Sequence, residues 1–102
     1  MQTGNASAAS QAFERALTTD PGDYGTHLNL ALFAFETQGL EQGLAWLKKA
    51  QVLNPQEPQA FLIEAQAMAQ SGEPAKARTI LEALLQRDPS LEPAKQLLKS
   101  LE

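Results

Sequence analysis

Apolar residues recur at spacings of three and four along most of this chain. The first such run covers residues 5–19, where small alanines share one face with the larger Phe13 and Leu17. This spacing places the apolar side chains on one side of an α-helix, so it predicts an amphipathic helix. Runs of the same kind predict further helices at roughly 24–38, 40–53, 58–70, 74–87 and 92–101.

Turn-forming residues separate these runs. Asp20-Pro21-Gly22-Asp23 should end the first helix, because proline pushes the preceding residue out of helical geometry and glycine favours a turn. Gly39 can supply the left-handed cap of the second helix. Proline also occurs near three predicted helix starts, where a missing N–H is tolerated, at Pro58, Pro74 and Pro93. No stretch alternates with the period of two typical of a strand, so we predict an all-α fold with about six helices.

The helix ends follow a fixed period. Pro21, Pro55 and Pro89 lie 34 residues apart. Three residues precede each proline at fixed spacings. The first is small, the second is large and lies four positions later, and the third is apolar and lies three positions after the second. The three sets are Ala9, Phe13 and Ala16; Gly43, Leu47 and Ala50; and Ala77, Leu81 and Leu84. We expect the small residues where two helices approach closely and the large ones in the gap between them.

This pattern resembles the second helix of the tetratricopeptide repeat, a helix–turn–helix unit with the same period. The match to the first helix is looser, with His27 and Phe61 where the family prefers tryptophan and Glu64 in place of a leucine. The resemblance implies a short right-handed α-solenoid of antiparallel helix pairs in a single domain, 1–102. Its expected parts are an incomplete repeat at 5–21, repeats at 22–55 and 56–89, and a capping helix at 90–102.

Composition and charge exclude several classes of protein. The chain has 102 residues, 43% of them hydrophobic, and a net charge of −4. Nucleic-acid binding depends on clustered lysine and arginine, and those residues are scattered here, so no nucleic-acid partner is expected. No run approaches the roughly 20 apolar residues of a membrane span. The N-terminus lacks a signal-peptide pattern, so we expect a soluble, cytoplasmic protein without membrane insertion.

The residues offer little chemistry for catalysis. A lone histidine at a helix start, His27, is more often a packed or surface residue than a catalyst. The glycines are dispersed, which excludes a glycine-rich phosphate loop. Acids such as Asp20 and Asp88 flank proline turns one repeat or more apart and suit turn chemistry. We therefore expect no enzyme activity, metal or cofactor. Trp46 is left with two interpretations, a packed or half-buried aromatic residue or a contact at a partner interface.

The resemblance implies a protein–protein interaction scaffold. In this family the first helices of successive repeats line a concave face that binds an extended or helical peptide of a partner protein. The corresponding residues here are Leu28, Leu32, Phe35, Glu36, Gln59, Leu62, Gln66 and Gln70. Members that bind acidic C-termini of chaperones use basic side chains and asparagines on this face. No lysine or arginine lies between Arg15 and Lys48 or between Lys49 and Lys76, so we expect a hydrophobic or polar-neutral segment instead. A merely solvated face, or one filled by the chain's own ends, is the alternative.

A second hypothesis is an oligomerisation or assembly module. Residues 5–19 match the second helix of a repeat whose first helix is not among these 102 residues. Arrays of this kind usually end in a polar capping helix, which 92–101 can provide at the other end. We expect Phe13 and Leu17 to form an edge that is covered either by a second copy, giving a homodimer, or by preceding sequence in a longer protein.

Overall fold

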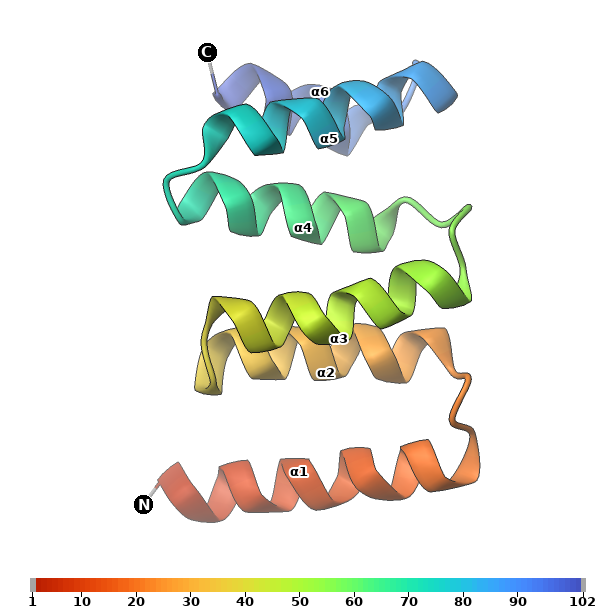
Figure 1. The fold of residues 1–102 in the computed structure, drawn as a ribbon, viewed down its shortest axis with the longest axis vertical. Helices are drawn as coiled ribbons and strands as arrows, with labels where there is room; N and C mark the ends of the chain where they lie inside the picture. The colour runs from red at the N-terminus through yellow and green to blue at the C-terminus, as the bar shows by residue number, and fades with distance from the viewer. Residues whose placement is uncertain (1, 102) are drawn as a thin grey trace. The chain divides into compact units, whose positions relative to one another are not determined.

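The computed structural model describes residues 2–101, and the side chains of residues 11–101. Six helices make up this part of the chain (Figure 1). They are α1 (Gln2–Thr19), α2 (Tyr24–Thr37), α3 (Leu40–Leu53), α4 (Gln59–Gln70), α5 (Pro74–Arg87) and α6 (Glu92–Ser100). Residues 2–101 contain no strand, and the prediction of an all-α fold with about six helices is confirmed.

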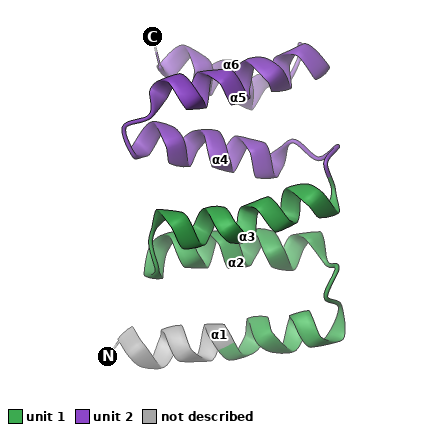
Figure 2. Ribbon diagram, in the orientation of Figure 1, with its two compact units in different colours: residues 1–54 green, residues 55–102 purple. Residues whose placement is uncertain are grey.

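The helices form two compact units, divided between Asn54 and Pro55 (Figure 2). Unit 1 holds α1, α2 and α3, and unit 2 holds α4, α5 and α6. In unit 1 the antiparallel pair α2 and α3 makes the main contact, and in unit 2 the pair α4 and α5 does so. The division falls at the Asn54-Pro55 turn, one of the three periodic prolines.

Small residues allow α2 and α3 to approach closely in unit 1. A Cβ atom built on Gly43 would overlap the ring of Phe35, so only glycine fits at this point of α3 without a shift of that ring. Ala31 and Ala50 are fully buried, and Leu47 is the large residue enclosed between the two helices. The small–large–small order along α3 therefore places the interior of unit 1 between α2 and α3.

A small residue followed by large ones builds the interior of unit 2. Ala65 of α4 and Ala77 of α5 have no exposed surface, and Leu81 is fully buried in the same interior. Ala94 of α6 is also fully buried, which lets this short helix lie against the pair. The guanidinium of Arg87 donates from Nη2 to the carbonyl oxygen of Pro55 and to Oε1 of Gln56, both at 3.1 Å. This contact ties the segment entering α4 to the end of α5.

Local contacts set the helix ends. Gly39 and Gly72 have φ angles of 105° and 87°, which L side chains rarely adopt, so glycine is required where α2 turns into α3 and α4 into α5. At the start of α2 the carboxylate of Asp23 accepts a hydrogen bond from the backbone N–H of Thr26 at 3.0 Å and another from the Thr26 hydroxyl. In the part of the chain that the structure describes, no helix combines the length and the apolar character needed to cross a membrane.

Candidate partner-binding surface

A hollow opens in unit 2 between α4 and α6. Leu62 and Gln66 line it from α4, one helical turn apart. Four residues line it from α6, at spacings that place them on one face of the helix: Pro93, Gln96, Leu97 and Ser100. The lining combines apolar side chains with amides and one hydroxyl, and it contains no ionisable side chain. Such a surface can bury apolar groups and exchange hydrogen bonds with a peptide backbone, but it offers no charge.

The packing of unit 2 determines which side chains reach this hollow. Ala65 and Met68 of α4 are buried, and Leu62 and Gln66 lie on a neighbouring side of the helix that borders the hollow. Leu62 is half-buried and Gln66 is exposed, which gives the hollow an apolar wall with an amide at its rim. The hydroxyl of Ser100 donates to the carbonyl oxygen of Leu97 at 2.7 Å, so its proton is already engaged within α6.

The structure brings two of the eight predicted groove residues, Leu62 and Gln66, together in this hollow. Gln59 and Gln70 are exposed at the two ends of α4 and do not line it. Sequence reasoning missed the α6 side of the hollow. The 34-residue period contains a signal for the α6 side, because Gln96 lies 34 residues after Leu62 and Ser100 lies 34 residues after Gln66.

The four predicted groove residues of α2 differ in exposure. Leu32 is 45% exposed and Glu36 is exposed, so both side chains are accessible. Leu28 is only 6% exposed, and Phe35 is half-buried with its ring over Gly43. Leu28 and Phe35 therefore contribute mainly to the interior of unit 1, and little of Leu28 is left for a partner.

His27 is engaged in packing and capping. Its side chain is 6% exposed, and Nδ1 lies 2.9 Å from the carbonyl oxygen of Asp23. A carbonyl only accepts, so Nδ1 donates and holds the ring against the start of α2. The pKa of the Asp23 carboxyl is lowered, first by the hydrogen bond from the Thr26 side chain, then by the Thr26 backbone N–H, with a smaller contribution from His27. Among the described residues, no group of three or more metal-ligating side chains could hold an ion.

Trp46 is half-buried and has two ring contacts. Its centroid lies 5.9 Å from that of His27 at an interplanar angle of 54°, and Nζ of Lys49 lies 4.5 Å from its centroid. The ring thus connects α3 with the start of α2 and carries a cation on one side.

The predicted edge on α1 is partly covered by the chain itself. The ring of Phe13 is half-buried and lies 5.4 Å from that of Phe33, tilted by 55°. Leu17 is also half-buried, and no side chain from residue 11 to residue 19 is fully buried. Phe13 and Leu17 line a hollow in unit 1 that Phe33 and Trp46 also border. The α1 face is therefore in contact with α2 without being sealed by it.

Two family models match this chain, and both are described as tetratricopeptide repeat. The first covers residues 1–62 and the second covers residues 58–100. No curated protein matches the chain. Repeats of this kind are generally protein–protein interaction modules. The helical hairpins, the small residues at their closest contacts and the matches across nearly the whole length agree: the chain belongs to the tetratricopeptide repeat family.

Proposed function

We propose that this protein is a non-enzymatic interaction module whose α4–α6 hollow binds an uncharged, partly apolar segment of a partner protein. The observation that carries this proposal is the lining of the hollow, where apolar and amide side chains occur together and ionisable ones do not. Neither lysine of α6 lines it, and Lys95 pairs with Glu92 at 3.5 Å. An acidic C-terminus would find no cation there.

The lining suggests how such a segment is held. Leu62, Pro93 and Leu97 offer apolar contact, whose burial provides most of the binding free energy in an interface of this kind. Gln66 and Gln96 each carry both donors and acceptors, which can pair with the backbone of an extended segment. In the repeat pattern Leu32 of α2 occupies the position of Gln66, and its 45% exposure makes it a candidate for the same role in unit 1.

Photo-crosslinking from single positions tests this proposal. A benzophenone amino acid replaces Gln66 in one variant and Glu82 in the other, since Glu82 is exposed on α5 and does not line the hollow. After irradiation in extract of the cells that make the protein, the variant labelled at position 66 should yield a discrete crosslinked product that the other lacks. Equal products from both positions, or a product only from position 82, would place the partner elsewhere.

A second candidate function is self-association through the face of α1. The half-burial of Phe13 and Leu17, with no fully buried side chain between residues 11 and 19, favours it. Light scattering of the purified chain should then give the mass of a dimer, and Leu17→Glu should give a monomer because a charge cannot be buried in an apolar contact without cost. A wild-type monomer would exclude the homodimer.

A further inference from the structure

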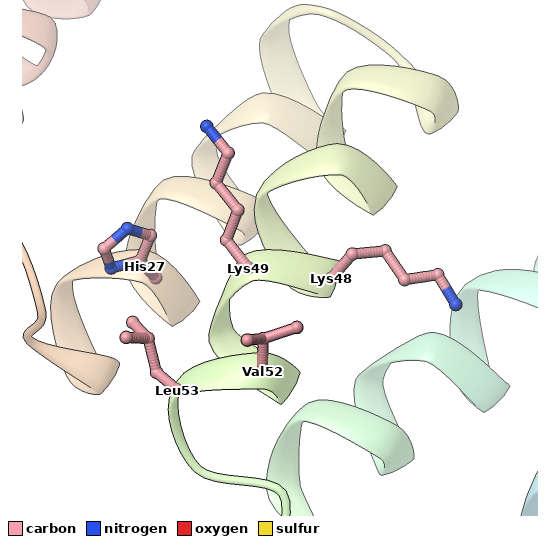
Figure 3. A pocket seen from close by; sticks show the side chains of 5 residues that line it. All are labelled: His27, Lys48, Lys49, Val52 and Leu53. Carbon is pink, nitrogen blue, oxygen red and sulfur yellow. The ribbon is translucent and has the colours of Figure 1, made fainter.

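A second hollow lies on unit 1, where the end of α3 meets the start of α2. Its lining consists of His27 from α2 and of Lys48, Lys49, Val52 and Leu53 from α3 (Figure 3). Val52 is 79% exposed and Leu53 is 42% exposed, and among residues 11–101 this is the place where two consecutive large apolar side chains reach the surface. Single exposed apolar residues are common on proteins, but a pair beside a hollow is a candidate for a contact surface.

The fold makes little use of Val52. Helix α3 packs on α2 through Gly43, Leu47 and Ala50, and Val52 lies on a different side of the helix. A β-branched residue also lowers helix propensity slightly, so valine is a poor choice for an exposed helical position. Neither packing nor helix formation therefore accounts for this residue, the only valine of the chain.

The charge beside the apolar pair is positive. Lys48 and Lys49 are the only adjacent basic residues in a chain with a net charge of −4. Their side chains extend in different directions from α3, with Lys49 leading toward the side of His27 (Figure 3). The ammonium of Lys49 rests on the indole of Trp46, an interaction that leaves it able to receive an anion.

Two carboxylates belong to the turn before α2, and neither lines the hollow. The carboxylate of Asp23 accepts from Thr26, and that of Asp20 accepts from the backbone N–H of Gly22 at 3.3 Å. A Cβ atom on Gly22 would lie 4.0 Å from Leu53, so this turn borders the apolar pair. The hollow thus presents apolar surface in its middle and a cation on one side.

We propose that this hollow binds an acidic segment of a partner protein. An aliphatic side chain of the segment lies against Val52, Leu53 and the ring of His27, and a carboxylate near it pairs with Lys49. The proposal concerns unit 1 alone and does not depend on the α4–α6 hollow, which lacks charge. The two surfaces should also respond differently to salt, because screening weakens the ion pair at Lys49 and leaves apolar burial intact.

Trp46 provides a built-in reporter of this event. It is the only tryptophan in the chain, and its ring carries the Lys49 ammonium at 4.5 Å. A carboxylate that draws the ammonium toward the hollow changes the charge next to the indole. Binding should therefore shift the emission of Trp46 in a saturable manner.

The test uses three short synthetic peptides of equal length. The first repeats Leu-Glu-Glu, the second repeats Leu-Gln-Gln and lacks charge, and the third repeats Ala-Glu-Glu and lacks the large apolar side chain. We expect the first to shift the Trp46 emission with a Kd below about 1 mM and each of the others to bind at least about tenfold more weakly. Absence of saturable binding by the first peptide, or equal binding by the second, would overturn the proposal.

Variants then locate the site by calorimetry, which does not depend on the indole. Lys49→Gln and Val52→Ser should each weaken the Leu-Glu-Glu peptide at least about fivefold, because each removes one of the two contacts. Lys76→Gln is the matched control, since Lys76 is an exposed lysine of unit 2 that pairs with Glu73 at 3.4 Å. Equal weakening by the control, or unchanged affinity of Val52→Ser, would show a nonspecific attraction between the acidic peptide and lysines.

Discussion

The ring of Phe35 lies directly over Gly43, so α2 and α3 meet where one helix has an aromatic side chain and the other has none. Leucine at position 43 has no space unless that ring moves. We predict that Gly43→Leu lowers the free energy of unfolding by about 1–3 kcal/mol. The gain in helix propensity over glycine, up to about 1 kcal/mol, should offset only part of this loss. Urea unfolding measures the difference.

Two further variants separate overpacking from propensity. Gly25→Ala is the matched control, because a Cβ there would meet only the Asp23 carboxylate, at 3.8 Å, and should be neutral or stabilising. Combining Gly43→Leu with Phe35→Ala should cost less free energy of unfolding than the sum of the two single changes. The leucine can fill the space that the Phe35 ring leaves. An unchanged unfolding midpoint for Gly43→Leu would show that the contact between Phe35 and Gly43 does not restrict the side chain at position 43.

Much of the helical layout was predictable, because each helix end carries its own local signal. Proline cannot continue a helix, and the positive φ of Gly39 and Gly72 needs glycine, so these positions indicate turns without knowledge of the fold. The close contact at Gly43 was predicted as well, from its place in the repeat. Its partner Phe35 was not, because a side chain's neighbour across two helices depends on how they pack.

The candidate site was harder to predict. Helix α2 is apolar on nearly all sides, so its sequence pattern does not distinguish the side that packs in the interior from a side that binds a partner. In the structure Leu28 is buried in the interior. Helix α6 was interpreted as a cap, and its contribution to a hollow was overlooked. The periodicity that relates Leu62 to Gln96 was visible, but only the packing of α6 through Ala94 brings the two helices together.

The capping contact of α2 should depend on pH. Hydrogen bonds from Thr26 lower the pKa of Asp23 below its ordinary value of 3.8. Because the folded pKa lies below the unfolded one, this contact stabilises the fold at pH values above the unfolded pKa and is lost as the pH falls through the folded pKa. Asp23→Ala should therefore lower Tm at neutral pH, and the difference from wild type should shrink in acid.

Asp23→Asn is the comparison for this effect. It keeps an oxygen that can accept from the Thr26 N–H but has no group that titrates. Its Tm should fall less steeply in acid than that of the wild type. Parallel Tm curves for Asp23→Ala and wild type between neutral and acidic pH would mean that the carboxylate does not stabilise the start of α2.

We predict that Arg87 stabilises the segment that leads into α4. Removing its side chain with Arg87→Ala eliminates both hydrogen bonds, to Pro55 and to Gln56, and should cost about 0.5–1.5 kcal/mol. Hydrogen exchange of the backbone amides at the start of α4 should become faster. Arg78→Ala removes an exposed arginine from the same helix and serves as the control. Equal effects of the two changes would argue for a loss of charge and against the specific contact.

The packing of α1 should depend on the ring contact between Phe13 and Phe33. Phe13→Ala should increase hydrogen exchange of the amides near Leu17, while those near Leu81 in unit 2 remain protected. Gln11→Ala, an exposed position two residues earlier, should leave both regions unchanged. In the wild-type monomer, protection near Phe13 equal to that near Leu81 would mean that α1 is sealed by its own contacts and needs neither a second copy nor preceding sequence.

Calorimetric titration is the most direct test of binding at the α4–α6 hollow. The protein is titrated with the partner segment that crosslinks to position 66, once at low salt and once at high salt. The wild-type Kd should change by less than about threefold between the two conditions, because apolar burial is not screened. Gln66→Glu, with an unchanged Tm, should weaken binding at least about tenfold, because it introduces a charge among uncharged contacts, and Glu82→Gln should bind as the wild type does. A Kd that rises steeply with salt, or a Gln66→Glu variant that binds as well as the wild type, would contradict an uncharged binding site between α4 and α6.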